Sequence, residues 1–117
     1  MGIHPEMQSC IENCTKCHQA SLNVITHCLQ QGGDHVDPQH IRLLQDCANI
    51  CATSADFMLR GSDLHVLTCG ACAEICLQCS EACASFSDDA VMKACADLCY
   101  KCHESCYAMS SGQEPAH

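Results

Sequence analysis

Hydrophobic and polar positions recur with helical spacing in four stretches of the chain. Within each stretch, residues of low polarity return three and four positions apart, which places them on one face of an α-helix. The stretches cover about 5–31, 38–60, 63–86 and 88–109. Each is roughly 20 residues long, which is ordinary for a helix and too long for a strand. The pattern predicts an all-α chain.

The boundaries between these stretches carry residues that cap helices or form turns. Pro at a first helical position, Ser or Asp before a helix and Gly after one are typical of helix ends. The boundary residues are His4-Pro5, Gly32-Gly33, Asp37-Pro38, Gly61 followed by Ser62 or Asp63, and Ser87-Asp88. Short connections predict an antiparallel four-helix bundle that forms one domain over residues 1–117. We expect the tail, 110–117, to be disordered.

The four stretches also repeat one another. The aligned segments are CIENCTKCHQAS (10–21), CANICATSADFM (47–58), CAEICLQCSEAC (72–83) and CADLCYKCHESC (95–106). They share the frame C-x3-C-x2-[C/S]-x3-[C/S/M], with Ser21 and Ser54 where other copies have Cys. A repeat in the same phase supports four equivalent helices around one axis.

The repeated face consists largely of cysteine. All fifteen thiols fall on the four helical faces that a bundle turns inward. Each exchange of a core Leu for Cys gives up apolar area worth about 1 kcal/mol, so we expect another purpose, metal binding. The predicted thiol ligands are Cys10, Cys14, Cys17, Cys28, Cys47, Cys51, Cys69, Cys72, Cys76, Cys79, Cys83, Cys95, Cys99, Cys102 and Cys106.

Charge and composition narrow the function. A net charge of −9 with only five Lys and Arg argues against binding to nucleic acid. No apolar run reaches the length of about 20 residues that a membrane span needs, so we expect no membrane span. An odd number of cysteines and an N-terminus, MGIHPEMQSC, without the features of a signal peptide argue against a secreted disulfide scaffold. We therefore expect a reducing compartment, the cytoplasm.

Copper is the metal that these thiols favour. Two thiolates three or four residues apart on one helix can hold Cu(I), which prefers soft sulfur, and one Cu(I) per thiolate leaves a neutral core. Zn(II) needs four ligands in a tetrahedron, which converging helices could supply, so a zinc or mixed-metal sink stays open. A thiol-based redox enzyme or sensor is a third possibility. The sequence contains no recognisable catalytic constellation, so we expect no enzymatic activity.

One end of the predicted bundle gathers additional soft ligands. The first turns of helices one and three and the last turns of helices two and four bring together Met58, His65 and Met109, which we expect to assist copper at an entry mouth. His103 lies beside the cysteine face and could reach a terminal ion. We expect His4, His35 and His117 to be exposed; His27 stays undecided.

A bundle of this length lined by CIENCTKC, CANIC, CGACAEICLQCSEAC and CADLCYKCHESC resembles the cytosolic copper storage proteins over residues 5–110. The resemblance implies multiple Cu(I) ions per chain, about one per Cys, no turnover and a homotetramer. It also implies a His-bearing open end, with His65 and His103 as candidates. We expect copper ions as partners and exchange with an unidentified copper chaperone or acceptor. Because Ser21 and Ser54 replace Cys, we expect a somewhat lower capacity and a column interrupted beside the second helix.

Overall fold

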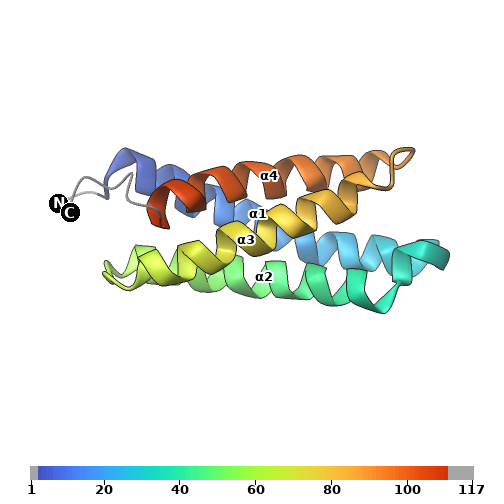
Figure 1. The fold of residues 1–117 in the computed structure, drawn as a ribbon, viewed down its shortest axis with the longest axis horizontal. Helices are drawn as coiled ribbons and strands as arrows, with labels where there is room; N and C mark the ends of the chain where they lie inside the picture. Colours follow the sequence, from blue (N-terminus) through green and yellow to red (C-terminus); the bar gives the residue numbers. More distant parts are fainter. Residues whose placement is uncertain (1–2, 111–117) are drawn as a thin grey trace.

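Four long helices run side by side along one axis in the computed structural model, which describes residues 3–110 (Figure 1). They are α1 (Pro5–Gln31), α2 (Pro38–Leu59), α3 (His65–Ala84) and α4 (Ala90–Ser110), with a short 3₁₀ helix, η1 (Gly33–Val36), between α1 and α2. The molecule measures 47 × 20 × 20 Å. This architecture confirms the predicted all-α antiparallel four-helix bundle.

The two ends of the bundle differ in what they contain. At one end lie η1 and the connection from α3 to α4; we call this the η1 end. The other end holds the start of α1, the connection from α2 to α3 and the end of α4; we call this the opposite end (Figure 1). Helices α1 and α3 each pack against α2 and α4, so α1 and α3 lie on one diagonal of the bundle.

The first helix has its predicted bounds, and the second begins where predicted and ends at Leu59, one residue before the expected end. His4 Nδ1 accepts the backbone N–H of Glu6 at 3.2 Å, and Asp37 Oδ2 accepts that of His40 at 3.3 Å. Gly32 follows α1 with φ 70°, and Gly61 follows α2 with φ 72°. This left-handed conformation costs glycine little, since it has no Cβ, and it lets the chain leave the helix.

The boundaries of the last two helices differ from the expected 63–86 and 88–109. Helix α3 begins at His65, because the Ser62 hydroxyl accepts the N–H of Leu64 (3.1 Å) in a turn that precedes the helix. Helix α4 begins at Ala90, because Asp89, rather than Ser87 or Asp88, caps it: Oδ1 accepts the N–H groups of Val91 (3.0 Å) and Met92 (3.3 Å). Ser110, expected in the tail, is the last residue of α4; the rest of the tail lies outside the described residues.

Small residues and polar links hold neighbouring helices together. Ala48, Ala55, Ala73 and Ala96 are buried beside the cysteine faces, where short side chains allow close helix approach. The Ser80 hydroxyl donates to the Ala96 carbonyl at 2.8 Å and joins α3 to α4. Close packing of this kind fixes the distances between sulfur atoms on different helices.

Among the described residues, α3 is long and apolar enough by composition to cross a membrane, with a mean hydropathy of 1.2. Its five cysteines (Cys69, Cys72, Cys76, Cys79 and Cys83) contribute much of that value, and all five are buried inside the bundle. A core helix of a bundle meets the same criterion, so the value is weak evidence for a membrane span.

Candidate metal centre

All fifteen cysteines point into the interior of the bundle. Cys95 is 2% exposed and every other cysteine is 0% exposed, and all are free thiols. The inward faces predicted from the spacing are therefore the buried faces. Ile11, next to Cys10 on α1, is buried as well.

The sulfur atoms form a column along the bundle axis. Contacts of 3.5–4.0 Å link one thiol to the next from Cys10 and Cys106 at the opposite end, through Cys51 and Cys76 in the middle, to Cys99 and Cys95. We call this the sulfur column. Cys51 and Cys47 contact this column from helix α2. We expected an interruption beside this helix, but the sulfur contacts of these two cysteines are continuous with the column.

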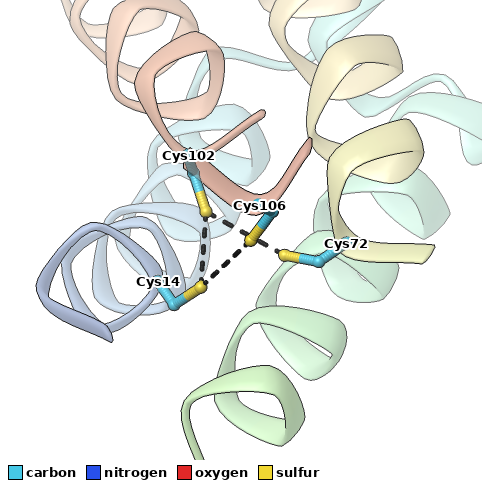
Figure 2. Close-up of side chains that lie close together, drawn as sticks. All are labelled: Cys14, Cys72, Cys102 and Cys106. Carbon is cyan, nitrogen blue, oxygen red and sulfur yellow. Dashed lines mark hydrogen bonds between the residues drawn. The ribbon is translucent and has the colours of Figure 1, made fainter. Parts of the chain in front are cut away.

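Figure 2 shows one layer of this column, in which Cys14 of α1, Cys72 of α3 and both Cys102 and Cys106 of α4 turn their sulfur atoms toward one point. The four Sγ atoms all lie within 4.8 Å of one another. Cys14 contacts Cys106 at 3.5 Å and Cys102 at 3.6 Å. Residues 92 positions apart in the chain thus share one potential metal site.

Neighbouring layers share their thiols. A second group consists of Cys17, Cys47, Cys51 and Cys76, and a third group consists of Cys51, Cys72, Cys76 and Cys102. The third group takes two members from each of the others. The groups are therefore not separate four-ligand sites, and a thiolate in the middle of the column can serve ions on both sides.

Protons are distributed unevenly within the column. Hydrogen bonds with Cys106 and Cys14 lower the pKa of Cys102, whereas hydrogen bonds to Cys10 and Cys102 raise the pKa of Cys106. A hydrogen bond with Cys10, together with burial, raises the pKa of Cys69 to about 12. A thiolate is stabilised by S–H donors around it, and those donors then ionise less readily. Metal that binds here must displace protons.

Cys28 lies at the η1 end, where its sulfur contacts a histidine and a methionine. Its sulfur is 3.6 Å from His40 Nε2 and 3.8 Å from Met92 Sδ, and all three side chains are buried. Burial raises the pKa of Cys28 to about 11 and lowers the pKa of His40. We call this group the Cys28 trio. The sequence predicts its thiol as a ligand but not its contacts with His40 and Met92, because spacing alone does not show which side chains meet.

The opposite end carries the expected soft ligands. Met58 Sδ lies 3.8 Å from Cys69 Sγ, and Met58, His65 and Met109 are all buried. The Nδ1 atom of His65 bonds the Ser62 carbonyl at 2.8 Å. Both ends of the sulfur column therefore bear methionine and histidine, and not only the end that the sequence favoured.

His103 faces a neighbouring helix. Its Nδ1 bonds the Ala73 carbonyl of α3 at 2.9 Å, and its ring lies beside Tyr100 and Tyr107. His18 makes the matching bond from α1 to the Ala48 carbonyl of α2 at 2.8 Å. Because Nδ1 is used in this hydrogen bond, Nε2 is the nitrogen through which His103 could bind a metal.

Two further histidines meet at Asp89, a contact that the sequence pattern does not predict. His27 Nε2 and His35 Nε2 bond the same Asp89 oxygen at 2.8 and 2.9 Å, and these bonds hold the pKa of Asp89 well below its usual range. His35, expected to be exposed, is thus half-buried. His4 is exposed as expected, and His117 lies outside the described residues.

Ser21 and Ser54 occupy cysteine positions of the repeat and are completely buried. Their hydroxyl oxygens lack a hydrogen-bond partner among the described residues. The hydroxyl of Ser54 lies near the thiol of Cys69. These serines place a polar group on the inward face without a strong metal ligand.

Known proteins are similar to this chain in sequence and architecture. The family model for copper storage protein matches residues 3–111. The Nmul_A1745 protein from Nitrosospira multiformis is 40% identical with a TM-score of 0.84, over 91% of this chain and 95% of that one. Cu(I)-bound copper storage protein BsCsp3, from Bacillus subtilis, is 34% identical with a TM-score of 0.83, over 91% and 99%.

A cytosolic copper storage protein from Streptomyces lividans, in a structure with five coppers, is 28% identical with a TM-score of 0.81, over 92% and 93% of the two chains. The match to the family model spans the whole of the described bundle, including all fifteen buried thiols. The chain belongs to the copper storage protein family.

Proposed function

We propose that this protein stores Cu(I) in the cytoplasm, bound by the thiolates of the sulfur column at about one ion per cysteine. The observation that carries the proposal is the unbroken series of sulfur contacts at 3.5–4.0 Å. Relatives with a Cu(I)-bound or copper-loaded structure support it.

The sulfur spacing suits metal coordination with little movement. With metal–sulfur bonds of about 2.3 Å, three sulfurs around one ion lie about 4.0 Å apart. Neighbouring thiols in the column already stand at 3.5–4.0 Å. Closing around an ion therefore needs side-chain rotations rather than a rearrangement of the helices.

The sharing of thiols favours Cu(I) over Zn(II). Structural zinc sites use four ligands of their own, whereas Cys51, Cys72, Cys76 and Cys102 each belong to more than one group. One Cu(I) per thiolate also leaves no net charge in the buried core, whereas Zn(II) at four thiolates leaves two negative charges per ion. We infer that zinc is a weaker competitor for the column.

Burial also argues against a thiol-based enzyme or redox sensor. Reactive cysteines are partly exposed, and the fifteen thiols here are at most 2% exposed. We therefore propose binding without turnover. Met58, His65 and Met109 are proposed ligands at the opposite end, as is His103 through Nε2. We extend the set with His40 and Met92 beside Cys28.

Anaerobic titration with Cu(I) against a chromogenic chelator tests the proposal. We expect saturation near one ion for each of the fifteen cysteines, and Zn(II) at equal concentration should leave Cu(I) bound. Saturation at four ions or fewer, or displacement by zinc, would contradict Cu(I) storage.

We also propose a homotetramer, which the family resemblance implies, and exchange with a copper chaperone or acceptor. Exposed apolar side chains could cover one another in such an assembly, among them Leu22, Leu29, Leu67 and Tyr107. Light scattering should give four times the chain mass of 12.6 kDa.

A further inference from the structure

We propose that His27, His35 and Asp89 form a site for one divalent cation of the zinc class at the η1 end, separate from the Cu(I) store. The inference goes beyond the storage function and does not depend on it. It starts from three side chains on three elements: His27 on α1, His35 on η1 and Asp89 directly before α4.

The donor atoms of these residues already converge. His27 Nε2 and His35 Nε2 lie 2.8 and 2.9 Å from the same atom, Asp89 Oδ2. Ligands of a tetrahedral Zn(II) at bond lengths of about 2.0–2.1 Å stand about 3.3 Å apart, so each of these two nitrogen–oxygen distances must grow by about 0.5 Å to fit the ion. The two ring centroids are 5.8 Å apart, against on the order of 5 Å for two imidazoles on one such ion.

The carboxylate is held in place for this role. Asp89 Oδ1 accepts the N–H groups of Val91 and Met92 at the start of α4. Only Oδ2 faces the histidines, so the carboxylate offers one fixed oxygen. Hydrogen bonds that orient a ligating group of this kind typically strengthen metal sites tenfold or more.

Solvent can reach the site. The side chains of His27, His35 and Asp89 are 21%, 18% and 18% exposed, at the edge of an open depression that Gln31 and Ser87 also line. A fourth coordination position is therefore available to water. Two imidazoles and a carboxylate suit borderline divalent ions such as Zn(II), and not the soft Cu(I) that thiolates prefer.

The aromatic ring of Phe86 separates this site from the Cys28 trio. Its centroid lies 4.2 Å from that of His35 and 5.1 Å from that of His40. Nitrogen and oxygen donors thus lie on the outer side of the ring, and sulfur with a buried imidazole on the inner side. The two donor sets select metals of different class.

The test uses protein whose thiols are already filled with Cu(I) under anaerobic conditions. Zn(II) is added, excess is removed, and zinc and copper per chain are measured. We expect one zinc per chain in the natural protein, at least about tenfold weaker zinc binding in Asp89→Asn, and unchanged copper content in both. Asn also caps helices, so this variant keeps the start of α4 while losing the charged ligand.

Asp97→Asn is the matched control, because it removes the same charge from an exposed side chain of α4 that does not line the depression. It should bind zinc like the natural protein. Imidazole ¹⁵N shifts of His27 and His35 give a second readout that does not depend on copper loading, so failure of copper storage would leave this test intact. The proposal is overturned if loaded natural protein binds no zinc, or if Asp89→Asn binds it as tightly as Asp97→Asn.

Discussion

At the scale of single residues, the two buried serines show how the column is limited. Ser21 and Ser54 occupy positions where the repeat elsewhere carries cysteine, and each buries a hydroxyl that the described residues leave unbonded. An unsatisfied buried hydroxyl costs on the order of 1–3 kcal/mol. The side chains at these positions therefore reduce both stability and the number of ligands.

Replacing Ser54 with Cys should restore a ligand. Because Ser54 lies near Cys69 at the opposite end, we expect Ser54→Cys to raise Cu(I) capacity by about one ion per chain. Ser54→Ala is the matched control: it should leave capacity unchanged and raise the free energy of unfolding by about 1 kcal/mol. Anaerobic titration and urea denaturation measure the two effects. Equal capacities in the Cys and Ala variants would contradict the ligand argument.

Histidines at the two ends distinguish the possible entry routes. His65 lies at the opposite end with Met58 and Met109, and His40 lies at the η1 end with Cys28 and Met92. We expect His65→Ala to slow Cu(I) uptake several-fold while leaving capacity nearly intact, because a terminal ligand mainly receives incoming ions. Stopped-flow measurement of the rate of Cu(I) uptake in His65→Ala and in His40→Ala compares the two ends of the bundle. A large loss of capacity in His65→Ala, or slowing only in His40→Ala, would refute the assignment.

At the scale of helices, the sequence pattern predicts the inward faces well and the helix boundaries less well. Cysteines three and four residues apart lie on one face of a helix, and the low-polarity face of a bundle helix is the buried one. The start of α4 depends on which of Ser87, Asp88 and Asp89 turns back to the helix, and local sequence fits all three. The half-burial of His35 depends on Asp89, 54 positions away, and no local pattern records that contact.

The cap of α2 gives a test at this scale. Asp37 accepts the N–H of His40, so Asp37→Ala should lower the free energy of unfolding by about 1 kcal/mol, whereas Asp37→Asn should cost only a few tenths. Urea denaturation of the metal-free, reduced protein measures both variants. Equal losses in the two variants would show that charge, and not capping, is responsible.

At the scale of the whole molecule, the buried thiols make stability depend on pH. The pKa of Cys28 is raised to about 11 and that of Cys69 to about 12, from an ordinary value of 9.0. A raised folded-state pKa stabilises the fold below about pH 9, and this contribution is lost as the pH rises toward 11–12. Thiols with a lowered pKa, such as Cys102, act in the opposite direction, but nine thiols have a raised pKa and five a lowered one. The metal-free protein should therefore unfold at lower urea concentration at pH 10.5 than at pH 8.

Copper loading supplies the control for this effect. Thiolates bound to Cu(I) have already lost their protons, so the loaded protein should show a much weaker dependence on pH in this range. Metal-free protein that gains stability between pH 8 and pH 10.5 would contradict the raised pKa values.

The enclosure of the sulfur column by four helices also determines the order in which stored ions can leave. An ion held near Cys51 and Cys76 has thiols above and below it along the axis and helices on every side, so it departs only through positions nearer an end. Withdrawal by a strong chelator should therefore proceed in successive kinetic phases, with the terminal ions lost first and the central ions last. Storage in such a fold supplies copper gradually, at a rate that falls as the reserve is depleted.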